Sequence, residues 1–149
     1  MIGSVVRCGI VAIAFYACAV AQTPENVLVV VNDTSPVSKQ IADYYIARRG
    51  IPRANVCRLH TTADERIDRS VYDQQIAKPI ATCLKAARLQ EKILYIVTTL
   101  GVPLKISGTE DKLGTYASVD SELTLLYSDM KSGKAHDTTG PARNPFYEL

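Results

Sequence analysis

Runs of apolar residues alternate along this chain with segments whose apolar residues recur at helical spacing. Residues 27–31 and 92–98 are near-continuous apolar runs, typical of strands buried on both faces of a parallel sheet, and residues 55–59 predict a shorter strand. Between these strands, apolar residues recur at helical spacing in residues 35–50 and 69–89, which predicts two helices. This order predicts right-handed crossovers and an α/β three-layer sandwich with a mostly parallel sheet, either Rossmann-like or flavodoxin-like.

The first predicted helix has clear signals at both ends. Ser35 supplies a capping hydroxyl, Pro36 fits the first helical position, and Gly50 stops the helix. The positions that continue at helical spacing are Val37, Ile41, Tyr44, Tyr45 and Arg48. We expect these residues to mark the apolar side of the helix.

The pattern is less regular in the rest of the chain. Pro79 lacks a backbone N–H and crowds the preceding turn, so we expect a kink or break near Lys78 in the second helix. Beyond Thr99 we expect a short strand at residues 102–106 and a helix over residues 118–127. Residues 128–149 read as a loop-like tail with no closing element, which leaves open whether the sandwich is incomplete at its C-terminal end.

The N-terminal segment has the features of a secretory signal peptide. Arg7 precedes a 13-residue apolar stretch, and Ala19-Val20-Ala21 provides an A-x-A cleavage site before Gln22. A membrane-spanning helix needs about 20 apolar residues, so this stretch is too short. We therefore divide the chain into a signal peptide (residues 1–21), an α/β domain (residues 22–127) and the tail, and expect an exported protein, periplasmic or secreted, with no membrane span after cleavage.

Charge and cysteine content narrow the function classes further. Cleavage leaves 16 basic and 15 acidic residues, a balance that argues against nucleic-acid binding. It also removes two of the four cysteines, so that only Cys57 and Cys83 remain. These two could pair in an oxidising compartment, but cysteines without special spacing mostly behave as buried apolar residues, and two buried thiols are the favoured alternative.

Four strings in a fixed order resemble an uncharacterised family of exported bacterial proteins. The strings begin at Leu28 (LVVVNDTSP), Arg48 (RRGIP), Ile96 (IVTTLGVPL) and Ala117 (ASVDSEL), and together the resemblance covers residues 27–127. It implies an exported α/β protein, and it implies a longer chain, because members of the family are usually longer than this one. It assigns no activity, cofactor, partner or catalytic residue.

The candidate functional residues lie mainly at the carboxyl ends of the predicted strands, where open α/β sheets bind ligands. Asp33 could bind a metal or act as a base, although an Asx turn or helix cap explains it as well, and Thr99 could hydrogen-bond a ligand. Asp120 and Glu122 offer paired carboxylates for a divalent cation or for acid/base work, although acidic residues in a first helical turn also complement the helix dipole. His60 and His136 have no metal-ligand spacing, and we expect both to be surface residues.

Two functions from different classes remain open. The first is a non-catalytic exported domain that binds a ligand or protein partner of unknown identity. The second is an envelope hydrolase that uses Asp33, Thr99, Asp120 and Glu122 as catalytic residues. The sequence contains no nucleotide-binding, serine-hydrolase or zincin motif, and because no pair of nucleophile and base can be named, the binding domain is favoured. Likeness to the first strand and helix of caspase-like and gingipain-like peptidases does not change this, since Cys57 and Cys83 fall in predicted core elements.

Overall fold

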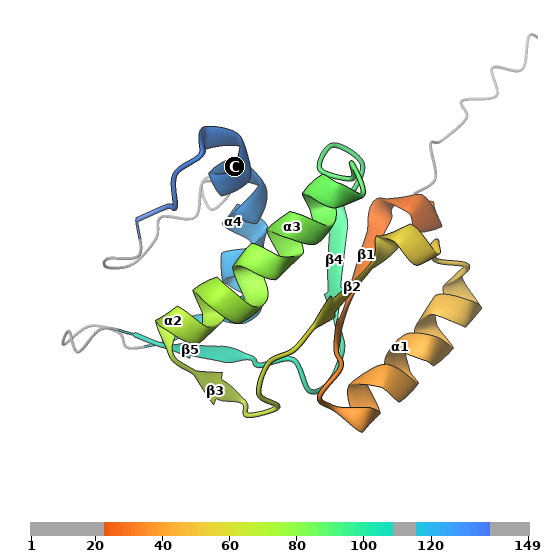
Figure 1. The fold of residues 1–149 in the computed structure, drawn as a ribbon, viewed down its shortest axis with the longest axis horizontal. Helices are drawn as coiled ribbons and strands as arrows, with labels where there is room; N and C mark the ends of the chain where they lie inside the picture. The colour runs from red at the N-terminus through yellow and green to blue at the C-terminus, as the bar shows by residue number, and fades with distance from the viewer. Residues whose placement is uncertain (1–22, 109–115, 138–149) are drawn as a thin grey trace, which may run out of the picture.

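The computed structural model describes residues 23–108 and 116–137, which form helices and two small sheets (Figure 1). The predicted signal peptide and the end of the predicted tail lie outside these residues. Sheet A has the order β2-β1-β4, and both pairings are parallel, whereas sheet B has the order β3-β5-β6 and is mixed. The chain therefore belongs to the mixed α/β class. The strands of sheet A are β1 (Val27–Asn32), β2 (Val56–Leu59) and β4 (Tyr95–Thr98).

Strand β1 is the centre of sheet A and separates two apolar cores. Val29 and Val31 pack towards helix α1 (Pro36–Arg49), whereas Leu28 and Val30 pack towards the helix that contains Ile80. Alternate residues of a strand point to opposite faces, so a strand with helices on both sides must be apolar throughout. Figure 1 shows β1 and β2 between α1 and α3 (Lys78–Ala86). The continuous apolar run predicted this two-sided burial.

Helix α1 has the predicted ends but not the predicted apolar side. The Ser35 hydroxyl accepts the N–H of Ser38, and Gly50 ends the helix in the left-handed conformation. The residues that pack on the sheet are small, since Ser38 and Ala42 are buried and bring the helix close to β1. Val37, Ile41 and Tyr44 are instead 40%, 39% and 68% exposed, whereas Tyr45 is half-buried against the core, so most of the expected apolar side faces outward.

The second predicted helix forms with a change of hydrogen bonding before its proline. It runs through α2 (Arg69–Tyr72), a π-helical turn η3 (Asp73–Ala77) and α3 (Lys78–Ala86). Pro79 cannot donate a backbone hydrogen bond, and the π-turn immediately before Lys78 lies where we expect the interruption. Ile76, Ile80 and Leu84 are buried against sheet A and α4, as their helical spacing predicts.

The second half of the described chain differs more from the sequence prediction. Sheet B contains β3 (Arg66–Ile67), β5 (Lys105–Ser107) and β6 (Tyr116–Ser118). Strand β3 lies between the strand predicted at residues 55–59 and the helix predicted at residues 69–89, where no element is expected. Strand β5 begins three residues after the start of the expected strand and pairs with β3 and β6 rather than with sheet A. Helix α4 (Val119–Ser132) continues past Tyr127, so residues 128–132 at the start of the predicted tail are helical where we expect a loop. The remaining elements are short 3-10 turns at Pro24–Asn26 and Arg53–Asn55.

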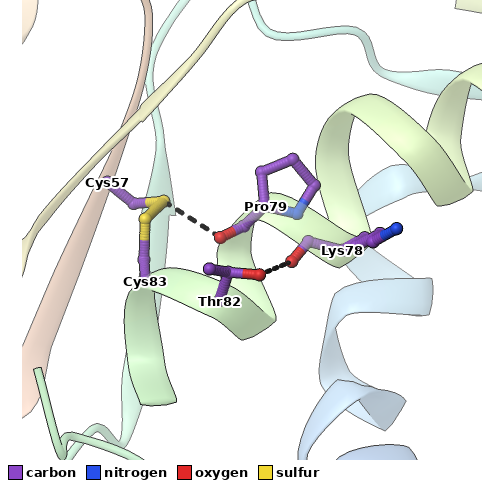
Figure 2. Close-up of a disulfide and its surroundings, with 5 residues drawn as sticks. All are labelled: Cys57, Lys78, Pro79, Thr82 and Cys83. Carbon is purple, nitrogen blue, oxygen red and sulfur yellow. Dashed lines mark hydrogen bonds between the residues drawn. A yellow bond between two sulfur atoms is a disulfide. The ribbon is translucent and has the colours of Figure 1, made fainter. Parts of the chain in front are cut away.

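A disulfide joins Cys57 on β2 to Cys83 on α3 (Figure 2). Their Cα atoms are 5.9 Å apart, a separation typical of disulfides, and Cys57 is fully buried. The favoured expectation of two buried thiols is therefore wrong, although both residues do lie in core elements. The sequence could not decide this, because strand and helix patterns give no distance between two side chains.

The disulfide predicts a measurable loss of stability when it is removed. It closes a loop across 26 residues of sequence, for which the chain-entropy argument gives about 3.5 kcal/mol. Replacing both Cys57 and Cys83 by alanine should lower the free energy of unfolding by about that amount in urea titrations, with reduced wild-type protein as a matched comparison. Two reactive thiols in denatured, unreduced wild-type protein would contradict the bridge.

Candidate functional site

The carboxamide of Asn32 holds together three loops at the carboxyl ends of the strands. Asn32 is fully buried, and its Nδ2 donates to the carbonyl oxygens of Thr61 at 3.0 Å, Thr62 at 3.2 Å and Gly101 at 2.7 Å. Its Oδ1 accepts the backbone N–H and the hydroxyl of Thr34 at 3.2 and 2.9 Å. Every hydrogen-bonding position of this amide is therefore used within the protein.

Thr99 belongs to the same internal network rather than to an open site. The backbone N–H of Asn32 donates to Ser38 Oγ at 2.8 Å, Ser38 Oγ lies 2.5 Å from Thr99 Oγ1, and Thr99 Oγ1 donates to the carbonyl of Val30 at 3.0 Å. Because Thr99 gives its hydrogen to Val30, the Ser38 hydroxyl is the donor between the two side chains. Thr99 is 5% exposed, so its hydroxyl holds β1, α1 and the end of β4 together.

The crevice between the ends of β1 and β4 is filled by the protein's own groups. Gly101 has φ of +98°, which side-chain-bearing residues rarely adopt, and a Cβ at this position would collide with the Ser35 side chain. This is the point at which the strand order reverses, and it is where a doubly wound sheet usually binds its ligand. In this protein the two loops pack directly against each other at that point.

Asp33 and Asp120 lie on opposite faces of sheet A. Asp33 Oδ1 accepts Arg58 Nη1 at 2.7 Å, and Arg58 is in register with Val31 on the α1 face. Asp120 Oδ1 lies 3.5 Å from Thr98 Oγ1, and Thr98 is in register with Val30 on the other face. The sheet therefore separates the two carboxylates.

Glu122 lies in a third place, in a cluster of charged side chains beside α2. Arg69 donates two hydrogen bonds to its carboxylate, at 2.7 and 3.1 Å, and His136 Nε2 lies 2.9 Å from Oε2. The other ring nitrogen of His136 lies 2.8 Å from Asp129 Oδ2. The four predicted site residues are thus distributed over separate environments and do not form one constellation.

The charges of this cluster stabilise one another. Burial raises the pKa of Glu122, but the hydrogen bonds and charge of Arg69, helped by His136, bring that pKa below its ordinary value. Burial lowers the pKa of His136, but Asp129 and Glu122 raise it above its ordinary value. Burial and the neighbouring Glu122 carboxylate raise the pKa of Tyr72, which therefore stays a neutral phenol. This cluster attaches the first turn of α4 to α2 and holds the segment after α4 against the helix, and each of its charged groups is already paired.

Sequence reasoning missed this cluster although a weak signal was present. Glu122 and Asp129 are seven residues apart, and two turns of a helix bring such positions to one face, whereas His136 lies beyond the end of α4. Because the helix predicted from the sequence ends at residue 127, Asp129 was not expected on the same helix as Glu122. His136 is partly exposed, with 23% of its side chain accessible, but it is not a free surface residue, because both ring nitrogens are paired.

An apolar groove of about 490 Å³ runs between β4 and α4. Leu94, Ile96 and Thr98 line it at alternating positions of the strand. The helix contributes side chains at positions 120, 123, 124 and 127, the spacing of a single helix face. Asp120 meets Thr98 at one end, while Tyr127 donates to Glu91 at 2.7 Å just before the strand begins, so α4 runs antiparallel to β4 along the groove. Other residues that line it are Leu84, Gln90, Ile93 and Leu126.

Comparisons with known proteins give no further assignment, since no protein family, curated protein or solved structure matches the chain. In the part of the chain that the structure describes, no three His, Cys, Asp or Glu side chains are arranged to hold a metal ion. No helix within residues 23–108 and 116–137 has the length and apolar character needed to cross a membrane.

The His136 cluster predicts a pH dependence of stability. His136 has a raised pKa in the folded state, so its contribution is fully present below the unfolded pKa of about 6.5 and is lost as pH rises through the folded pKa. The groups paired with it are the carboxylates of Asp129 and Glu122, and the hydrogen bonds and charge of Arg69 keep the pKa of Glu122 below its ordinary value, which favours the charged form of that carboxyl. The substitution His136→Asn should therefore lower the free energy of unfolding by more at pH 5.5 than at pH 8.5.

The matched control for this measurement is His60→Asn, because His60 is exposed. That variant should lose little stability at either pH. Urea titrations at both pH values measure the two differences. An equal loss for His136→Asn at pH 5.5 and 8.5 would show that the histidine contributes through packing alone.

Proposed function

We propose that this protein is exported and acts outside the cytoplasm as a non-catalytic binding domain. Export is supported by the n-region, apolar stretch and A-x-A site within residues 1–21. The bridge between Cys57 and Cys83 also supports it, because stable disulfides are typical of oxidising compartments and rare in the cytosol. The resemblance of the four strings to a family of exported bacterial proteins also supports export to the periplasm or beyond.

The export proposal predicts the N-terminus of the mature protein. Expressed from its own start codon in a bacterium, the chain should be recovered outside the cytoplasm with Gln22 as its first residue. N-terminal sequencing and intact mass measure this directly. Replacing Ala19 and Ala21 by bulky leucines should leave the precursor uncleaved, and uncleaved wild-type protein in the cytosol would refute the proposal.

The groove between β4 and α4 is the observation that supports a binding function. Ligand sites are typically concave, of about 300–1,000 Å³, mostly apolar and furnished with a few polar groups. The groove has this size and composition, with six aliphatic side chains and the polar residues Gln90, Thr98, Asp120, Thr124 and Tyr127. We infer that it is the surface through which the domain recognises its ligand or partner.

The hydrolase remains the alternative, and the geometry gives it less support. Its proposed carboxylates are divided between the two faces of sheet A and the Arg69 cluster. The hydroxyl of Thr99 is buried and already donates to Val30. A nucleophile within hydrogen-bond reach of a base is the minimum that such a reaction needs, and these four residues do not provide it.

A larger sandwich is a further part of the proposal. Sheets of doubly wound proteins contain about five or six strands, whereas sheet A has three within the described residues. Helices already lie on both of its faces. We infer that sheet A is the centre of a Rossmann-like or flavodoxin-like three-layer sandwich.

The binding proposal predicts that a neutral apolar dye such as Nile red binds in the groove. Leu94 lies at the rim and is 65% exposed, so Leu94→Lys should leave the fold intact and weaken dye binding about tenfold by removing apolar contact. Tyr44→Lys is the matched control, because Tyr44 is 68% exposed on α1 away from the groove. Fluorescence titration measures both, and equal binding by the Leu94→Lys variant and wild type would exclude the groove as the site.

A further inference from the structure

The two edges of sheet A differ in how they are protected from other strands. Edge strand β2 carries Arg58, a charged and half-exposed residue that pairs with Asp33, and charged residues on an edge discourage further strand pairing. Edge strand β4 has the sequence Tyr-Ile-Val-Thr, with no charge. Leu94 and Leu100, which flank it, are each 65% exposed. The β4 edge therefore has the character of a strand that another strand covers.

The backbone of β4 also offers unpaired hydrogen-bonding groups along the groove. The backbone N–H of Thr99 donates to the carbonyl of Val30 on the β1 side, at 3.2 Å, and Thr98 is the residue in register with Val30. In a parallel strand alternate residues bond to opposite neighbours, so the N–H and C=O groups of Ile96 and Thr98 point away from β1. Within the described residues, no strand pairs with this outer edge. Only an extended polypeptide matches such a row of alternating donors and acceptors.

The charged residue of the groove predicts the kind of side chain at one end of the bound segment. Among the described residues that line it, Asp120 is the one charged side chain, and it lies at the carboxyl end of β4 beside Thr98. The apolar positions Leu94 and Ile96 precede it along the strand. A complementary segment therefore presents apolar side chains to the groove and a basic side chain to Asp120.

We propose that an extended segment of a partner protein binds in this groove by adding a strand parallel to β4, with alternate apolar side chains against Ile96 and Leu123 and a basic residue beside Asp120. The orientation follows sheet A, in which both pairings are parallel. The proposal rests on the binding function inferred above and names the chemical class of the partner. A second copy of this chain is a less suitable occupant, because self-pairing brings no basic residue of the groove to Asp120.

A set of matched peptides tests the proposal on the cleaved, exported chain. The probe is a fluorescein-labelled peptide of alternating valine and threonine with arginine at its carboxyl end, and fluorescence anisotropy measures its binding. Two further probes carry N-methyl groups on alternate amides, one set on each edge of the strand. Methylation of the edge that faces β4 should weaken binding about tenfold by removing two hydrogen bonds, and methylation of the other edge should leave it nearly unchanged.

The charge component is tested separately. Replacing the probe's arginine by glutamine should weaken binding about threefold, the effect of one partly exposed ion pair. Asp120→Asn should abolish the difference between the two probes, whereas Asp43→Asn, an exposed change on α1, should preserve it. Persistence of the full difference in Asp120→Asn would overturn the assignment of the basic residue.

The remaining outcomes separate this inference from the function on which it rests. If Nile red binds in the groove and both methylated probes bind as well as the parent, strand addition is wrong while the binding function stands. If neither dye nor peptide binds, both proposals fail. Sedimentation velocity tests the remaining case, in which a second copy of the chain occupies the groove. If the wild-type chain is a dimer and Leu94→Lys makes it a monomer, the groove is a dimer interface and the proposal of a partner segment is wrong.

Discussion

The buried carboxamide of Asn32 is the interaction on which the rest of the structure depends. It lies at the end of the central strand and bonds to the loops that follow β1, β2 and β4, so it fixes the relative positions of all three strand ends. A buried amide that lost these partners would leave several carbonyl oxygens unsatisfied, each at a cost of about 1–3 kcal/mol. The same bonds close the crevice where this type of sheet usually binds ligands. Because this crevice is closed, the β4 edge is the part of sheet A that remains open to a ligand.

Most of sheet A could be predicted from the sequence because its signals are local. The valine run of β1 indicates burial on both faces, and the Ser35 and Gly50 caps define α1. The outward side of α1 could not be predicted in this way. Helical spacing identifies a stripe of apolar residues, but Ser38 and Ala42 face the sheet because small residues allow the helix to approach β1 closely. Which stripe is buried depends on packing distance, and the sequence pattern contains no distances.

Sheet B and the Arg69 cluster were missed for related reasons. Strand β3 has two residues, too few to show any periodicity, and it forms only because β5 lies beside it. The four predicted site residues were grouped because all follow strands or begin a helix, yet each points in a direction that tertiary packing determines. Gly133 was a usable signal, since it ends α4 in the left-handed conformation and would have placed Asp129 on the same helix as Glu122.

The contrast between β2 and β4 connects the fold to the proposed function. A parallel strand buried on both faces and at both edges has little reason to carry charge, and the sequence of β4 fits that description while its outer edge is open. The protein does protect an edge where it needs to, as Arg58 on β2 demonstrates. The absence of charge on β4 is therefore better explained by a strand that covers it than by tolerance of exposure. Because Ile96 faces the groove wall formed by α4, a strand that pairs with β4 also gains an apolar surface for its own side chains, and backbone pairing and side-chain burial then reinforce each other.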